Sequence, residues 1–160
     1  MKLLFIRHGD PDYTIDSLTE KGWKEAEFLS EKIAALDVRD FYVSPLGRAQ
    51  RTALPSLEAA GCKAETVEWL QEFPAKLDVN KAPELAEAYP DIEKEGEKYR
   101  TRIVWDMAPG YLTEHEEYMD KTNWRHSLVA KCSDMEDVYD KVTKEFDTLL
   151  AKHGYVRENG

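Results

Sequence analysis

Arg7, His8 and Gly9 follow a short apolar run and carry side chains well suited to chemistry. A guanidinium binds phosphate or carboxylate through two parallel hydrogen bonds. An imidazole can act as a nucleophile, a base or a metal ligand, and Gly9 lets the backbone turn or approach a ligand closely. A solvated turn at the end of a strand explains the same three residues equally well, so further segments must decide between the two interpretations.

Arg48 lies in the first turn of a helix expected from Leu46 to about Ala60, with Ser44 and Pro45 before it and Gly61 as its C-cap. Because a helix N-terminus favours anions, an Arg beside it predicts a phosphate site. Glu72 lies between apolar residues just after a weak strand pattern. A partly desolvated carboxyl there could serve as a general acid, although the residues alone favour an exposed loop glutamate.

The elements that must position these groups are read from periodicity. Leu3–Ile6 has the continuous apolar pattern of a buried parallel strand. Ligands in open α/β sheets bind beyond the carboxyl ends of strands, which is where Arg7 and His8 stand. A helix is expected from about Thr19, and Asp40–Val43 and Lys63–Glu68 predict two further short strands.

Residues 74–133 lose this regularity and are expected to form a helical insertion, with a polar helix over 91–102. A capping box at Ser133–Glu136 predicts a final helix over 134–153, and His153 at its end has a structural role in this interpretation.

Composition narrows the class of protein. A chain of 160 residues predicts a single domain over 1–160. The net charge of −10 argues against nucleic acid or an anionic membrane as a partner. The two cysteines, Cys62 and Cys132, show no CxxC spacing, which favours a reduced cytoplasmic protein. No apolar stretch is long enough to span a membrane.

Taken together, these motifs resemble the histidine phosphatase superfamily, the phosphoglycerate mutase-like proteins. Order and spacing agree over roughly residues 2–73. The matching residues are Leu4–Gly9, Leu18 and Thr19 with Gly22 and Ala26, Ser44–Ala49 with Thr52 and Ala53, and Leu70–Glu72.

The resemblance implies a three-layer α/β/α sandwich with a mostly parallel sheet, in which residues 74–133 cover the active site. It implies that His8 takes the phosphoryl group, that Arg7 and Arg48 hold its oxygens, and that Glu72 protonates the leaving oxygen and then activates water. A small phosphorylated substrate is expected, and neither a metal nor another cofactor is needed.

The family carries a second pocket His after a later strand, and none of His115, His126 and His153 has that context. We therefore expect a C-terminally incomplete domain with weak or no activity. The sheet edge left exposed would recruit a second copy of the chain as a homodimer.

Three alternatives to a phosphatase stay open. The first is a phosphoglycerate-type mutase. The second is a metal-dependent hydrolase that uses His8, Asp10 and Asp12. The third is a fragment that binds phosphate without catalysis.

Overall fold

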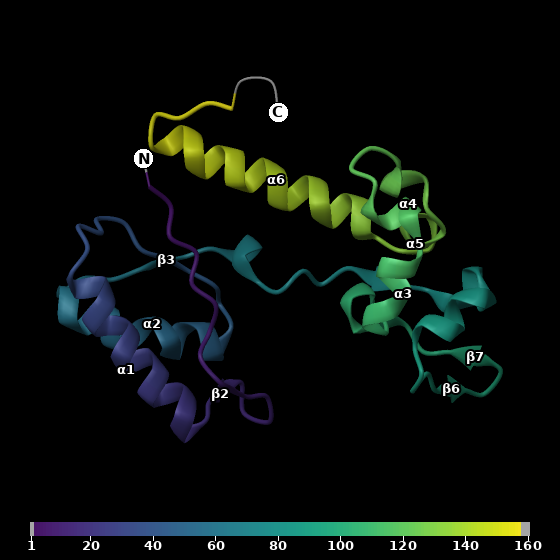
Figure 1. The fold of residues 1–160 in the computed structure, drawn as a ribbon, viewed down its shortest axis with the longest axis horizontal. Helices are drawn as coiled ribbons and strands as arrows, with labels where there is room; N and C mark the ends of the chain where they lie inside the picture. Colours follow the sequence, from purple (N-terminus) through teal and green to yellow (C-terminus); the bar gives the residue numbers. More distant parts are fainter. Residues whose placement is uncertain (1, 158–160) are drawn as a thin grey trace. The chain divides into compact units, whose positions relative to one another are not determined.

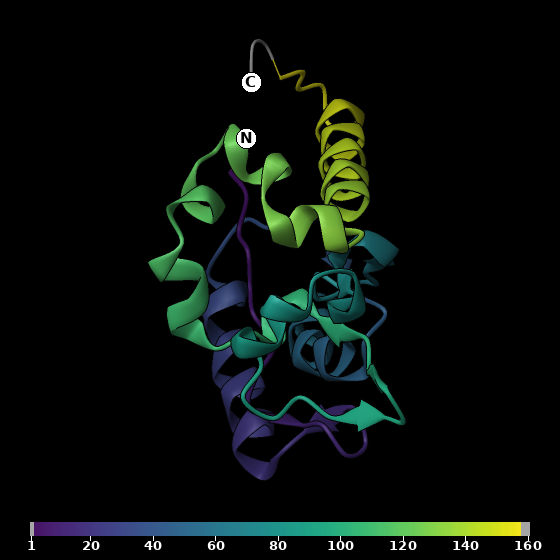
Figure 2. The same cartoon turned by 90° about the vertical axis from the view of Figure 1, so that its right-hand side faces the viewer.

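The computed structural model of the chain describes residues 2–157, apart from the side chains of Glu116 and Met119. It contains two compact units, the first ending at Gln71 and the second beginning at Glu72 (Figures 1 and 2). Both combine helices with short strands, so the chain has an α/β fold.

The first unit has the order of turn, helix, strand and helix expected from the sequence. Its elements are β1 (Pro11–Asp12), β2 (Ser17–Leu18), α1 (Glu20–Ala34), β3 (Tyr42–Val43), α2 (Gly47–Ala60), β4 (Glu65–Thr66) and the 3₁₀ turn η1 (Glu68–Leu70). β1 and β2 form an antiparallel hairpin, whereas β3 and β4 pair in parallel across the α2 crossover.

The predicted helices of this unit are confirmed, with the Thr19 cap of α1 and the Gly61 C-cap of α2, but the N-cap residue of α2 is Leu46 and not Ser44. Thr19 caps α1 by accepting a hydrogen bond from the backbone N–H of Gly22. Gly61 ends α2 with φ of 62°, a left-handed conformation that glycine adopts at low cost. α1 packs against α2, and Ala26 and Ile33 supply its fully buried side chains.

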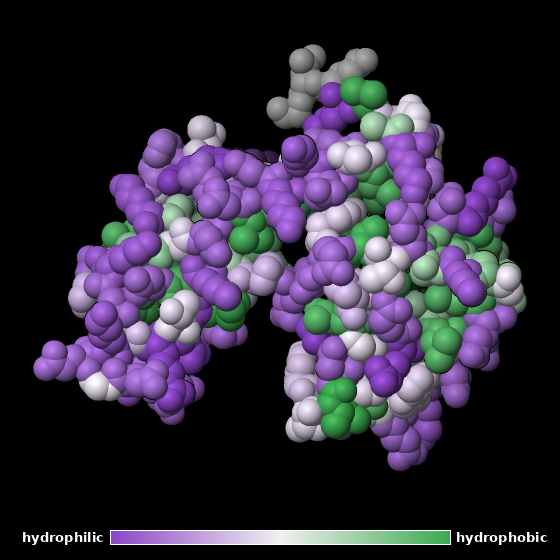
Figure 3. All heavy atoms as spheres, turned by 180° about the vertical axis from the view of Figure 1, so that it is seen from behind, coloured by the Kyte–Doolittle hydropathy of each residue, from purple (hydrophilic) through white to green (hydrophobic). Residues whose placement is uncertain are grey.

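The prediction of a buried strand at Leu3–Ile6 is wrong. This segment belongs to no strand, and its four side chains are 46–70% exposed. A strand needs the N–H and C=O groups of a neighbour to complete its ladder, and within residues 2–157 no strand pairs with it. Figure 3 shows apolar side chains reaching the surface of the first unit.

The second unit is built of short pieces around its own core. In chain order they are β5 (Lys76–Leu77), η2 (Val79–Lys81), η3 (Pro83–Ala88), β6 (Lys94–Glu95), β7 (Lys98–Tyr99), β8 (Arg102–Ile103), η4 (Val104–Asp106), α3 (Pro109–Glu114), α4 (Glu116–Met119), η5 (Asn123–His126), α5 (Leu128–Cys132) and α6 (Met135–Lys152). Leu77, Val79, Leu85, Tyr89, Val104 and Val129 are its largest fully buried side chains.

Two details of the second unit differ from the sequence expectations. The polar helix predicted over 91–102 is wrong, because β6 and β7 form a hairpin that turns at Gly96 with φ of 67°. The final helix is confirmed as α6, but not its capping box. Asp134 is its N-cap residue, and the Asp134 carboxylate accepts a hydrogen bond of 2.6 Å from the backbone N–H of Lys76 instead.

Candidate functional site

His8 is half-buried, and its ring is fixed by a local hydrogen bond. Its Nδ1 atom lies 2.8 Å from the carbonyl oxygen of Gly9. A carbonyl oxygen can only accept, so Nδ1 must carry the proton. In the neutral ring Nε2 then holds the lone pair, which is the state that a nucleophilic histidine requires.

Gly9 connects the His8 turn to α2. Its backbone N–H donates to the hydroxyl oxygen of Thr52 at 3.0 Å, and that hydroxyl donates in turn to the carbonyl oxygen of Arg48 at 2.8 Å. Thr52 is buried, which protects both hydrogen bonds from water. The turn that presents His8 is therefore tied to the first part of the helix that carries Arg48.

Asp10 connects the same turn to α1. Its backbone N–H donates to Glu25 at 2.8 Å, its carbonyl oxygen accepts from the N–H of Thr19, and its carboxylate accepts from the Thr19 hydroxyl at 2.6 Å. That hydroxyl is the main reason why the pKa of Asp10 lies below its usual value. A Cβ on Gly22 would come within 2.2 Å of the Asp10 carbonyl oxygen, so glycine is required at this contact.

Arg48 is buried, and its guanidinium is held by the loop between β1 and β2. Nη1 donates to the Asp16 carboxylate at 2.9 Å, and the guanidinium carbon lies 5.4 Å from the centre of the Tyr13 ring. The same carboxylate accepts from the backbone N–H of Gly47 at 2.5 Å. The N-terminus of α2, expected from the sequence to bind phosphate, thus already faces a carboxylate of this chain.

Asp16 contacts the candidate site and was not identified from the sequence. Its partners Gly47 and Arg48 lie 31 and 32 residues further along the chain. The hydrogen bond from Gly47, chiefly, keeps the pKa of Asp16 below its ordinary value. Its only local signal is an Asp within a turn, which does not predict a partner so distant in sequence.

Arg7 and Glu72 are both exposed. Within residues 2–157 the Arg7 side chain makes no hydrogen bond or ion pair, so its guanidinium is available to an anion. Glu72 is the first residue of the second unit. The first unit therefore holds three of the four predicted site residues, Arg7, His8 and Arg48, on two segments joined by the Thr52 hydroxyl.

The other three histidines lie in the second unit. The His115 ring stacks on Tyr111 at 4.2 Å between centroids, and its Nδ1 lies 2.7 Å from the Tyr111 carbonyl oxygen. His126 is exposed in η5. His153 lies at the C-terminal end of α6, as expected, and is itself the C-cap residue.

The described residues contain no cluster of metal ligands that would support a metal-dependent hydrolase. Metal sites of this kind combine three or more His, Cys, Asp or Glu side chains. Between Lys2 and Arg157 the structure brings no such group together. The carboxylates of Asp10 and Asp12 accept hydrogen bonds from Thr19 and Thr14 instead.

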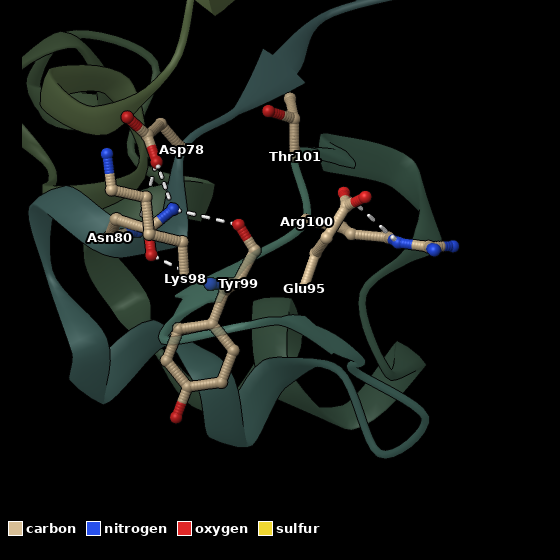
Figure 4. Close-up of a pocket in the computed structure, with 7 residues that line it drawn as sticks. All are labelled: Asp78, Asn80, Glu95, Lys98, Tyr99, Arg100 and Thr101. Carbon is tan, nitrogen blue, oxygen red and sulfur yellow. Dashed lines mark hydrogen bonds and ion pairs between the residues drawn. The ribbon is translucent and has the colours of Figure 1, made fainter.

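A hollow of about 560 Å³ lies in the second unit, lined by Asp78, Asn80, Glu95, Lys98, Tyr99, Arg100 and Thr101 (Figure 4). The Asn80 amide exchanges two hydrogen bonds with the backbone of Tyr99, at 2.8 and 2.9 Å. Arg100 pairs with Glu93 at 3.2 Å and with Glu95 at 3.9 Å. These polar groups hold the β6–β7 hairpin in place, and they do not form a concentrated positive site for a phosphate.

Comparison with known proteins identifies the family of this chain. A family model described as the histidine phosphatase superfamily, branch 1, matches residues 3–102, which is more than half of the chain. The chain belongs to the histidine phosphatase superfamily, a family of phosphoryl-transfer enzymes.

Two relatives are phosphoglycerate mutases by name. The chain is 23% identical over 145 residues to the probable phosphoglycerate mutase GpmB of Cronobacter sakazakii, a match that covers 84% of this chain and 64% of that protein. It is 40% identical over 60 residues to the 2,3-bisphosphoglycerate-dependent phosphoglycerate mutase of Thermoplasma acidophilum, covering 31% of this chain and 30% of the relative. The chain thus spans less than two thirds of the length of either relative. Over residues 2–157 no helix is both long and apolar enough to cross a membrane.

Proposed function

We propose that the protein hydrolyses small phosphomonoesters through a phosphohistidine on His8. The observation that carries the proposal is the hydrogen bond between His8 Nδ1 and the Gly9 carbonyl oxygen, because it leaves Nε2 as the nucleophile. Membership of the histidine phosphatase superfamily supports the same chemistry.

In the first step Nε2 of His8 attacks phosphorus, the ester P–O bond breaks, and the leaving oxygen takes a proton from Glu72. In the second step water attacks phosphorus, the P–N bond breaks, and Glu72 recovers a proton from that water. Arg7 and Arg48 stabilise the charge on the phosphoryl oxygens in both steps. Phosphoryl transfer depends mainly on positioning and charge stabilisation, which two guanidiniums supply without a metal.

A phosphoglycerate-type mutase is the second candidate, favoured by the names of the two relatives. A mutase must keep water away from its phosphohistidine until the product is phosphorylated again. His8 is only half-buried and Arg7 is exposed. Access of water to the ring supports hydrolysis over isomerisation.

The remaining expectations stay part of this proposal. They are a three-layer sandwich with a mostly parallel sheet, a single domain in which residues 74–133 cover the site, a cytoplasmic location and a homodimer. The homodimer is supported by the exposed apolar side chains of Leu3–Ile6.

The test is hydrolysis of p-nitrophenyl phosphate at mildly acidic pH with excess EDTA, comparing the wild type, His8→Ala and His126→Ala. His126 is exposed in the second unit and serves as the matched control. Weak turnover that resists EDTA, persists in His126→Ala and is lost in His8→Ala is the expected result. Turnover that survives in His8→Ala refutes the assignment of the nucleophile, and turnover that EDTA abolishes favours the metal-dependent hydrolase.

A further inference from the structure

The Asp16 carboxylate joins two parts of the α2 N-terminus at once. Oδ2 accepts from the backbone N–H of Gly47 at 2.5 Å, and Oδ1 accepts from the Arg48 guanidinium at 2.9 Å and, more weakly, from the Arg48 N–H at 3.4 Å. The N-cap residue of α2, Leu46, offers no side-chain cap. Asp16 therefore replaces the missing cap from a separate loop and, with the same group, holds the guanidinium.

The backbone at Asp16 is adapted to this role. Its φ of 45° is left-handed, a conformation that Asp and Asn tolerate better than most residues. Its carbonyl oxygen lies so close to α2 that a Cβ on Gly47 would come within 2.1 Å of it. The same oxygen lies 3.5 Å from Nη1 of Arg51. The loop and the helix therefore approach so closely at Asp16 and Gly47 that a larger residue at position 47 would clash.

We propose that Asp16 is a positioning residue that holds the Arg48 guanidinium ready for the phosphoryl group. The inference rests on the proposed function, in which Arg48 binds phosphoryl oxygens. A free Arg side chain populates many rotamers. Fixing it in one rotamer when the ligand binds costs entropy and weakens the affinity for the ligand. A side chain ordered beforehand by Asp16 avoids that loss. Nothing in the local sequence of either residue reveals this pairing.

A simple charge effect predicts the opposite result. Asp16 is negative and lies beside a site for an anion, so electrostatics alone would make its neutralisation strengthen phosphate binding. The Asp16 side chain is 44% exposed, and solvent screens that repulsion. The positioning role predicts weaker binding after neutralisation, so the sign of the change separates the two effects.

The variant Asp16→Asn tests the inference. Asn has the same size, tolerates the left-handed backbone conformation, and keeps an oxygen that can accept the hydrogen bond from the Gly47 N–H. Asp12→Asn is the matched control. It makes the same change at the end of β1, next to the loop that holds Asp16, and the Asp12 carboxylate accepts hydrogen bonds from Thr14. NMR of ¹⁵N-labelled protein follows the Arg48 side-chain signals, assigned with Arg48→Lys, during a titration with inorganic phosphate.

We expect Asp16→Asn to move the Arg48 signals toward those of a solvent-averaged arginine and to weaken phosphate binding roughly three- to tenfold, with Asp12→Asn unchanged. In an Arg48→Lys background Asp16→Asn should weaken binding no further, since its effect passes through Arg48.

Phosphate binding that is equal or tighter in Asp16→Asn overturns the inference, as do Arg48 signals that stay unchanged. If phosphate shifts neither the Arg48 nor the His8 signals of the wild type, the proposed function fails and the positioning role fails with it. The two failures are distinguished by whether the wild type binds phosphate.

Discussion

Thr52→Val removes the hydroxyl that links the His8 turn to α2 and keeps the β-branched shape of the side chain. Two hydrogen bonds disappear, the one that Thr52 accepts from the Gly9 N–H at 3.0 Å and the one that it donates to the Arg48 carbonyl oxygen at 2.8 Å. The Arg48 carbonyl belongs to a helix, so the second loss is small. The Gly9 N–H, which is half-buried, loses its partner.

The loss of stability follows from this difference. A buried donor left without a partner costs about 1–3 kcal/mol, and the added methyl group of Val recovers up to about 0.8 kcal/mol by burial. We expect the free energy of unfolding to fall by about 1–2 kcal/mol, which lowers Tm by roughly 4–8 °C per kcal/mol for a unit of this size. The phosphorylation of His8 should slow about tenfold, because the turn that presents its ring is no longer held.

Thr148→Val is the matched control. Thr148 donates to the Lys144 carbonyl oxygen at 2.9 Å on the exposed side of α6, the same bond to the residue four positions earlier, without a second partner. Its stability should change by less than about 0.5 kcal/mol. The Tm from thermal unfolding and the rate of single-turnover phosphorylation are measured for both variants. Thr52→Ser keeps the hydroxyl and should have a Tm and a rate close to those of the wild type. Equal, small losses in Thr52→Val and Thr148→Val would refute the link through Gly9.

Three further predictions concern the same unit. Gly22→Ala should lower the free energy of unfolding in urea, because a clash with the Asp10 carbonyl costs about 1–3 kcal/mol and the gain in helix propensity is about 1 kcal/mol. Gly110→Ala is the control, since its new Cβ meets only a flexible Glu side chain. An equal loss of stability in Gly110→Ala would argue against the clash. The Thr19 hydroxyl, chiefly, lowers the pKa of Asp10, so this stabilisation is present above about pH 4 and is lost as pH falls through the lowered pKa. Acid unfolding followed by circular dichroism should therefore be less steep in Asp10→Asn, and an unchanged profile would contradict the assignment. Phe5 is 70% exposed, so Phe5→Lys should reduce concentration-dependent association in sedimentation velocity; wild type that stays monomeric at all concentrations would count against the homodimer.

Local signals in the sequence predicted the helices well. The periodic apolar residues, the Thr19 cap and the Gly61 C-cap act within a few residues of one another, and the structure confirms all three.

The two wrong predictions of secondary structure have different causes, one distant in the sequence and one local. Leu3–Ile6 has a strand composition, but a strand also depends on a neighbour that the run itself does not specify. The 91–102 segment is rich in Glu and Lys, which suits a helix, yet Gly96 allows the tight turn that pairs β6 with β7.

The sequence identified the residues of the candidate site but not the hydrogen bonds that hold them in place. The motifs identified Arg7, His8 and Arg48 as chemical groups. Thr52 holds the His8 turn and Asp16 holds Arg48. Each makes a hydrogen bond to a residue more than 30 positions away in the sequence. Such contacts depend on how the segments fold together, so a pattern of spacing alone does not contain them.

The central claim is that His8 accepts the phosphoryl group. The most direct measurement is mass spectrometry of the protein after rapid mixing with a small phosphoryl donor such as acetyl phosphate, with peptide mapping under alkaline conditions that preserve phosphohistidine. The account predicts one acid-labile phosphoryl group on His8, present in His126→Ala and absent in His8→Ala. A phosphoryl group on any other residue, or none on His8 while the donor is consumed, would contradict it.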